Sequence, residues 1–250
     1  MTAPVFLVEE GALTGVFPGT LFPLGGPEGR HAVSVRRLRV GEEITLTDGA
    51  GNGAFGTVAS VEGKDRLEVA VTSVRSEPLP EPRITVVQAL PKGDRGELAV
   101  ETMTETGVDA IVPWSAARCI TQWKGERGAK SLAKWRSTAR EAGKQSRRLR
   151  FPPVAEPMTT KQVAVLLADA DFAAVLHEEG HSAPLATAGL PASGSIVLVV
   201  GPEGGVSPEE LAVFADAGAR PYRLGPSVLR TSTAGTAATA LLLGRTGRWS

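Results

Sequence analysis

A continuous apolar run followed by a glycine-rich turn marks residues 196–210. Ile196 to Val200 is a short, β-branched run, which predicts a fully buried strand. The next five residues, Gly201-Pro202-Glu203-Gly204-Gly205, contain three glycines and let the backbone turn sharply against a ligand. Ser207, Pro208 and Glu210 then predict a helix that begins with a capping box.

A second strand, glycine-containing turn and helix are predicted in the same order between about residue 220 and residue 243. A short strand to Leu224 precedes the turn Gly225-Pro226-Ser227, and a helix of small residues is predicted from Thr233 to Leu243. Arg230 lies between Leu229, which can be buried, and Thr231, which can cap the following helix. Two such turns, side by side at the carboxyl ends of parallel strands, predict a site for a flat, polar ligand.

Alternating positions predict a separate β-rich domain in the first 76 residues. Residues 44–47 and 54–61 alternate on either side of a turn, and residues 66–74 alternate again, which predicts a compact, barrel-like meander. Residues 25–29 (GGPEG) repeat part of the later turn without a flanking strand or capped helix, so we expect a loop there.

Three prolines between Ser76 and Pro82 predict a stiff linker. Beyond it, a strand over 84–90, a helical stretch to about Thr106 and a strand over 108–112 are typical of an α/β domain with a mainly parallel sheet. The sequence therefore predicts two domains, at 1–76 and 77–250.

Composition excludes few classes of protein, because 27 basic residues balance 27 acidic ones. The beginning, MTAPVFLVEE, lacks the features of a secretory signal, and no apolar run has membrane-spanning length. The single cysteine, Cys119, excludes an internal disulfide and is expected to be a small, buried apolar residue. We therefore expect a cytoplasmic protein without a membrane span.

Basic residues gather between 118 and 150, where eleven oppose two acidic residues. An apolar helical stripe runs through Leu132, Trp135, Ala139 and Ala142. Basic residues follow an adjacent face at Arg136, Arg140, Lys144 and Arg148. Such a face is either merely solvated or contacts RNA phosphates, and the scarcity of acids favours RNA. The segment from His31 to Val40, with Arg36 and Arg37, leaves the same two interpretations open.

Residues 177–181 match the zinc hydrolase pattern HExxH, with His177, Glu178 and His181. The preceding residues look like the end of a strand, and Gly180 would weaken a helix, so we expect no metal there. The turn at 201–205 lacks the lysine of a phosphate-binding loop, and Glu203 would repel a phosphate but tolerate a sulfonium cation.

The segments GPEGGVSPEE, at 201–210, and LGPSVLRTSTA, at 224–234, resemble the RsmE family, the 16S rRNA (uridine-N3) methyltransferases of the SPOUT superfamily. The basic helix also resembles the family pattern at Glu141-Ala142, Gln145-Ser146 and Arg148. The resemblance implies an α/β fold: a C-terminal, trefoil-knotted SPOUT methyltransferase domain with an N-terminal PUA-like β-barrel. It also implies S-adenosylmethionine as cofactor, 16S rRNA or the small ribosomal subunit as substrate, and a homodimer.

The resemblance further implies which residues act. Candidate cofactor-binding residues are Leu176, His177, Glu178, Val200, Gly201, Pro202, Glu203, Gly204, Gly205, Leu224, Gly225, Val228, Leu229, Arg230 and Thr231. Candidate RNA-binding residues are His31, Arg36, Arg37, Arg118, Arg136, Arg140, Lys144 and Arg148. Arg230, a cation at a helix start, is the candidate catalytic residue.

Two positions depart from the family pattern. Many members have Glu where this chain has Ser232, and often Lys where it has Thr102, which leaves the general base unidentified. A non-catalytic RNA-binding protein and a zinc hydrolase are the alternative functions.

Overall fold

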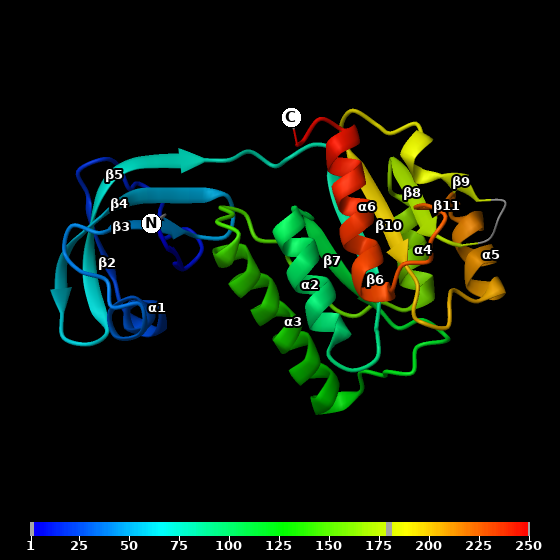
Figure 1. Ribbon diagram of the computed structural model, residues 1–250, viewed down its shortest axis with the longest axis horizontal. Helices are drawn as coiled ribbons and strands as arrows, with labels where there is room; N and C mark the ends of the chain where they lie inside the picture. Colours follow the sequence, from blue (N-terminus) through cyan, green and yellow to red (C-terminus); the bar gives the residue numbers. More distant parts are fainter. Residues whose placement is uncertain (1–2, 179–181, 250) are drawn as a thin grey trace. The chain divides into compact units, whose positions relative to one another are not determined.

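The computed structural model describes residues 3–178 and 182–249, which divide into two compact units (Figure 1). The first unit contains the chain up to Leu79 together with residues 140–151, and the second contains residues 80–139 and the chain from Pro152 onward. The sequence placed residues 140–151 in the second domain. Thr47 Oγ1 and Gly51 N–H both donate to the carbonyl oxygen of Leu149, at 2.9 Å each, so these bonds tie this segment to the first unit.

A five-stranded sheet forms the first unit, in the order β1-β3-β4-β5-β2. Its strands are β1 (Val5–Leu7), β2 (Leu21–Leu24), β3 (Glu43–Thr47), β4 (Asn52–Glu62) and β5 (Arg66–Ser76). β1 pairs with β3 in parallel, whereas the other pairs are antiparallel. The predicted meander over β3, β4 and β5 is therefore confirmed. Its core contains Phe6, Ile44, Leu46, Leu67 and Val69, all buried.

The prediction of a loop at residues 25–29 is wrong. β2 ends at Leu24, and α1 (Gly26–Arg30) follows and continues into the π-helical turn η1 (His31–Val35). A Cβ on Gly29 would lie 2.3 Å from the carbonyl oxygen of Asp65, so glycine allows the helix to pack closely on the sheet. Pro23 inside β2 hides the strand from a pattern search, because proline is rare within strands.

Six parallel strands form the sheet of the second unit, in the order β7-β6-β10-β8-β11-β9. The strands are β6 (Arg83–Ala89), β7 (Ala110–Trp114), β8 (Phe172–Leu176), β9 (Ala183–Pro184), β10 (Ser195–Val200) and β11 (Arg220–Arg223). The predicted parallel sheet is confirmed. The strand predicted over 196–200 is β10, which lies between β6 and β8.

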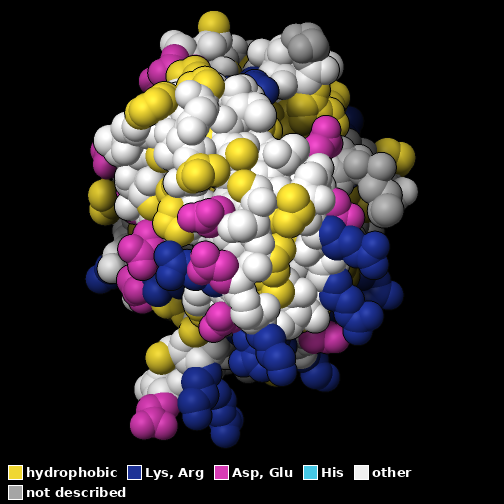
Figure 2. Space-filling view, turned by 90° about the vertical axis from the view of Figure 1, so that its left-hand side faces the viewer, with side chains coloured by type: hydrophobic (Ala, Val, Ile, Leu, Met, Phe, Trp, Pro, Cys, Tyr) yellow, Lys and Arg dark blue, Asp and Glu magenta, His cyan; other side chains and the backbone are white. Residues whose placement is uncertain are grey.

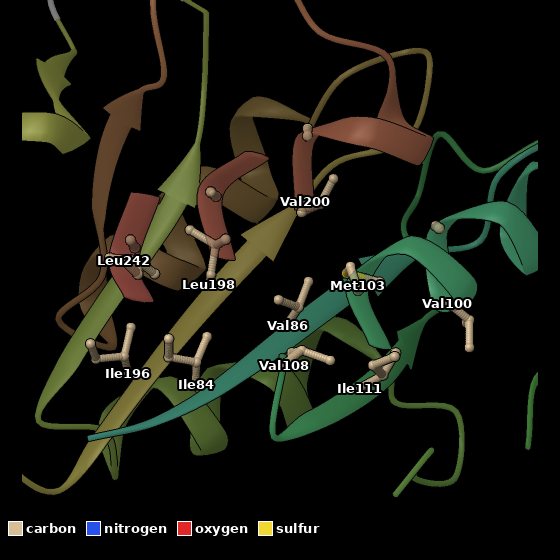
Figure 3. Packing of buried hydrophobic residues seen from close by; sticks show 14 of the residues in the cluster. Ile84, Val86, Val100, Met103, Val108, Ile111, Ile196, Leu198, Val200 and Leu242 are labelled. Atoms are coloured by element: carbon tan, nitrogen blue, oxygen red, sulfur yellow. The ribbon is translucent and has the colours of Figure 1, made fainter. Parts of the chain in front are cut away.

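Helices cover both faces of this sheet. They are α2 (Arg95–Thr106), α3 (Gly125–Gln145), α4 (Thr160–Ala168), α5 (Pro208–Asp216) and α6 (Thr231–Arg245), with a 3-10 turn η2 (Leu185–Thr187). Alternate strand residues, including Val86 and Leu198, pack against α2, α6 and the first part of α3 (Figure 3). The intervening residues, including Val87 and Val199, pack against α4 and α5. In the described part of the chain, no helix is long and apolar enough to cross a membrane.

Candidate functional site

Three loops meet at the carboxyl edge of the parallel sheet. β8 lies between β10 and β11, with Val175 paired to Val199 and Leu176 paired to Tyr222. The two glycine-rich turns are thus separated by one strand rather than adjacent, and the loop from His177 lies between them. The N–H of His177 donates to the carbonyl oxygen of Tyr222 at 2.9 Å, which extends the strand pairing into that loop.

The turn after β10 needs glycine at two positions, Gly201 and Gly205. Gly205 has φ +72° in the left-handed region, and its N–H donates to the carbonyl oxygen of Pro202 at 2.9 Å. A Cβ on Gly201 would lie 2.9 Å from Cγ2 of Val206. A Cβ on Gly225 would meet no described atom within 4 Å, so packing does not require glycine in the second turn.

Glu203 connects this turn to the loop before α2. Its Oε1 accepts a hydrogen bond from the N–H of Lys92 at 3.1 Å and lies 3.5 Å from Nη1 of Arg95. Arg95 offsets the carboxylate charge. The sequence argument that this charge selects a cation over a phosphate is therefore weakened.

Glu210 closes the predicted capping box of α5 and holds two further segments. Its Oε2 accepts from the N–H of Ser207 at 3.1 Å, and its own N–H donates to Ser207 Oγ at 3.2 Å. Its Oε1 accepts from the N–H of Ala117 at 2.8 Å and from Oγ1 of Thr160 at 3.0 Å. The carboxylate is buried, at 5% exposure, and therefore joins the loop after β7 and the start of α4 to the end of the turn after β10. Sequence reasoning found only the cap, because the other two partners are distant in the chain.

Arg118 belongs to the same junction, the meeting point of the loop after β7, the start of α4 and the turn after β10. Its Nη1 donates to the carbonyl oxygen of Gly204 at 3.0 Å, so this candidate RNA-binding residue lies on the turn after β10. The pKa of the Glu209 carboxyl group is lowered, chiefly by hydrogen bonds from the backbone N–H of Glu209 and from the side chain of Ser207. The charge of Arg118 makes a smaller contribution. Burial raises the pKa of the neighbouring Cys119 thiol, which makes it a poor nucleophile at neutral pH.

The second turn exposes its apolar residues. Val228 is 73% exposed and Leu229 is 41% exposed, so Leu229 does not take the buried position that the sequence allows. Thr231 does not cap α6 either. Arg230 is the N-cap residue without a side-chain cap, and Thr231 is the first residue of the helix. The hydroxyl of Thr231 instead donates to the carbonyl oxygen of Gly201 at 2.7 Å, which joins the two turns.

The zinc pattern does not lie on a helix where it is described. β8 continues to Leu176 and His177 keeps the strand pairing, whereas His181 lies outside the described residues. Among the residues that have described positions, no group of three or more His, Cys, Asp or Glu side chains is arranged to hold a metal ion.

The candidate RNA-binding residues in and just after α3 differ in their surroundings. The apolar stripe through Trp135 and Ala139 is buried, as predicted. Arg136 donates through Nε to the carbonyl oxygen of Val154 at 3.0 Å and pairs with Glu156 at 2.8 Å. Arg140 is exposed, and Arg148 is half-buried.

Lys144, in the first unit, forms ion pairs within the chain. Its side chain is only 10% exposed, and its Nζ lies 2.8 Å from Glu28 Oε1 and 3.2 Å from Glu141 Oε1. Two carboxylates already neutralise this ammonium group. The pattern of one basic residue per helical turn therefore mixes structural residues with surface residues.

Arg36 and Arg37 are exposed at the end of η1, where Arg37 adopts φ +56°. His31 is half-buried, and its ring lies edge-on to Phe6 at 5.9 Å between centroids. On the face drawn in Figure 2, Lys and Arg side chains form several groups, with Asp and Glu among them. Basic surface is thus present, but it is interrupted by acidic residues.

The two departures from the family pattern lie on helices that pack together. Oγ1 of Thr102 on α2 lies 2.7 Å from Oγ1 of Thr236 on α6, and Ser232 is 3% exposed. Gly235 of α6 packs against Met103 of α2, where a Cβ would lie 2.6 Å from the sulfur. The small residues of α6 therefore serve packing within the chain.

Comparison with protein families gives two matches along the chain. An RNA methyltransferase domain matches residues 77–243, and an RNA methyltransferase PUA domain matches residues 24–72.

Known proteins resemble the chain over nearly its whole length. Ribosomal RNA small subunit methyltransferase E of Mycobacterium bovis is 46% identical, with 100% of this chain and 94% of that protein covered. The Bacillus subtilis protein of the same name is 30% identical over 85% of this chain and 86% of its own length. The crystal structure of ribosomal RNA small subunit methyltransferase E from Neisseria gonorrhoeae, bound to S-adenosyl methionine, has a TM-score of 0.84 and 30% identity, and covers 98% of each chain.

Proposed function

Since the chain belongs to the ribosomal RNA small subunit methyltransferase E family, we propose that it methylates 16S ribosomal RNA with S-adenosylmethionine as methyl donor. Family membership confirms the expected fold class, a PUA-like domain followed by a knotted SPOUT methyltransferase domain. One observation carries the functional proposal: the family similarity includes the turns after β10 and β11, which lie at one edge of the sheet and are joined through Thr231. Domain boundaries at 1–76 and 77–250 belong to the same proposal and follow the order of the chain, although residues 140–151 are part of the first compact unit.

The chemistry of these loops suits an adenosyl ligand. Leu176 and Leu224 are half-buried apolar residues at the ends of β8 and β11, and Val200 is buried at the end of β10. Gly201 and Gly205 let the backbone approach a ligand closely. When bound, S-adenosylmethionine supplies an electrophilic methyl group on a sulfonium. We therefore propose the residues of the three loops, from Leu176 to Glu178, from Val200 to Gly205 and from Leu224 to Thr231, as the cofactor site.

Arg230 is the proposed catalytic residue. Transfer to N3 of a uridine requires loss of the N3 proton, and negative charge then grows on the uracil carbonyl oxygens. The exposed guanidinium of Arg230, at the start of α6, is suited to stabilise that charge. We expect Arg230→Ala to lower kcat about a hundredfold with little change in cofactor affinity. Arg230→Lys should restore only part of kcat, because an ammonium group cannot make the planar two-pronged contact. Loss of cofactor affinity at unchanged kcat would make Arg230 a binding residue instead.

The RNA is proposed to contact exposed cations in each unit. Arg36, Arg37 and Arg140 belong to the first unit, and Arg118 belongs to the second. Arg136 and Lys144 are engaged by carboxylates and are proposed to support the fold instead. Because the proposed substrate is ribosomal RNA, we also propose that the protein acts in the cytoplasm.

We further propose a homodimer. The exposed side chains of Val228 and Leu229, within the third loop of the proposed cofactor site, provide apolar surface for a partner. Light scattering coupled to gel filtration measures the mass directly. A monomeric mass at enzyme-assay concentrations would overturn this part of the proposal.

Calorimetric titration with S-adenosylmethionine, followed by transfer of its labelled methyl group to 16S rRNA, tests the function. We expect one cofactor per chain and a product methylated at uridine N3. Binding of RNA without cofactor would support the non-catalytic alternative. One zinc per chain by metal analysis, lost in His181→Ala, would support the hydrolase alternative.

A further inference from the structure

A buried chain of hydrogen bonds connects three segments at the cofactor edge of the sheet. Gln88 lies at the end of β6, next to Val200 of β10, and is completely buried. Its Nε2 donates to Oγ1 of Thr231 at 3.0 Å, and the Thr231 hydroxyl donates to the carbonyl oxygen of Gly201 at 2.7 Å. The first residue of α6 is thereby fixed to the first residue of the turn after β10.

The hydroxyl group of Thr231 determines which group donates and which accepts in each of these hydrogen bonds. A carbonyl oxygen only accepts, so the single proton of Thr231 Oγ1 goes to Gly201. The hydroxyl must then accept from its other neighbour, which requires the NH2 group of Gln88 and not its oxygen. The second proton of Nε2 goes to the carbonyl oxygen of Ala89, at 3.1 Å. This orientation leaves Oε1 of Gln88 buried with no hydrogen-bond partner among the described residues.

An unpaired buried oxygen is costly, and a Leu or Met side chain would avoid the cost. β6 is otherwise apolar along its buried residues Ile84, Val86 and Val87. A polar side chain kept at such a cost calls for an explanation, and a role in catalysis is one of them. Here the NH2 group acts on the two segments that the proposed function uses, the turn from Gly201 and the helix start that carries Arg230.

We propose that Gln88 is a positioning residue for methyl transfer. Its amide group donates to the Thr231 hydroxyl, which donates to the Gly201 carbonyl oxygen. These bonds fix the position of the turn after β10 relative to the backbone of Arg230. This inference rests on the proposed function. Gln88 touches neither the cofactor nor the RNA in this role, and acts through Thr231 alone.

Substitutions of Thr231 test the chain of bonds, and α6 provides a matched control. Thr231→Val keeps the shape of the side chain but leaves the Gly201 carbonyl and one N–H of the Gln88 amide without a partner, so kcat/KM should fall roughly tenfold to a hundredfold. Thr231→Ser retains the hydroxyl and should recover most of the activity. Thr239 is equally buried on the same helix, and its hydroxyl has no hydrogen-bond partner in the described part of the chain. Thr239→Val should therefore leave kcat/KM unchanged.

Gln88→Glu provides a test within a single folded protein. The new carboxyl group, when protonated, donates to Thr231 as the amide does, whereas a carboxylate cannot. Burial raises the pKa of such a carboxyl group, so the change falls in an accessible pH range. The activity of Gln88→Glu relative to the wild type should therefore rise as pH falls. Gln88→Leu should be impaired at every pH.

The outcomes separate the two proposals. If the wild-type protein does not bind S-adenosylmethionine in the calorimeter, the proposed function fails. If the wild type binds and methylates RNA, but Thr231→Val behaves like Thr239→Val and the relative activity of Gln88→Glu does not depend on pH, the positioning role of Gln88 is wrong. Thermal unfolding of each variant identifies any loss that comes from misfolding, and Thr231→Ser and the pH series then decide the question.

Discussion

Glu210→Gln should destabilise the second unit, because no orientation of an amide can replace this carboxylate. Oε1 accepts from Ala117 N–H and Thr160 Oγ1, and Oε2 accepts from Ser207 N–H. A glutamine offers one oxygen and one NH2 group, so its NH2 must face at least one of these donors. The less costly orientation opposes only the N–H of Ser207, a residue that is 6% exposed.

The expected loss can be estimated from these contacts. One buried donor without an acceptor costs about 1–3 kcal/mol. Removal of a negative charge from the first turn of α5 costs about 0.3–1 kcal/mol more. A total of about 2 kcal/mol lowers the midpoint of urea unfolding by roughly 1 M, if the denaturant slope is about 2 kcal/mol per M.

Tryptophan fluorescence measures this effect in the right part of the chain. The chain has four tryptophans, and all belong to the second unit, at Trp114, Trp123, Trp135 and Trp249. The fluorescence transition therefore reports unfolding of that unit alone. Glu209→Gln is the matched control: Glu209 is exposed on the same turn of α5, so this variant should lose only the helix-dipole contribution of about 0.3–1 kcal/mol, and its urea midpoint should fall less than that of Glu210→Gln. Equal midpoints for Glu210→Gln and Glu209→Gln would refute the idea that Glu210 organises the junction.

Three further predictions concern the cofactor turn, the basic helix and the C-terminal segment. Gly205→Val places a β-branched residue at φ +72°, so it should abolish calorimetric binding of S-adenosylmethionine while the far-ultraviolet circular dichroism stays near that of the wild type. Arg140→Glu should reduce the salt dependence of RNA binding by about one unit of slope, whereas Arg136→Glu should chiefly lower the melting temperature because it loses two protein contacts. Arg248→Ala should cost about 3–5 kcal/mol in urea unfolding, because Asp109, 7% exposed, then lacks its paired cation. An unchanged midpoint in the last variant would show that Asp109 is satisfied without it.

Local signals explain which elements the sequence predicts well. β10 and α5 follow from a β-branched run and a capping box, both of which act within a few residues. The same kind of signal was overlooked at α4, where Thr159 and Gln162 form a complete capping box. Glycine and proline obscure α1 and β2, because their roles there depend on packing against Asp65 and on an edge position.

The candidate site depends more on contacts that sequence spacing does not reveal. The motif indicates Gly201 and Thr231 separately, but their hydrogen bond joins residues thirty positions apart. The sequence does give a signal for Gln88, which is the one amide side chain in the largely apolar run ITVVQAL at 84–90. The basic residues of α3 look equivalent in sequence, and only the positions of Glu28 and Glu156 distinguish Lys144 and Arg136 from Arg140.

The assignment of residues 140–151 to the first unit has a consequence for biosynthesis. The ribosome completes the strands β1 to β5 long before it makes Leu149, whose carbonyl oxygen accepts from Thr47 and Gly51. At about 5–20 residues per second, the nascent sheet waits several seconds for this last segment. During that interval α2, β7 and most of α3 leave the ribosome, so the first unit cannot be completed before folding of the second has the chance to begin. The N-terminal unit is first in the chain, but it is completed only after several elements of the second unit have been made.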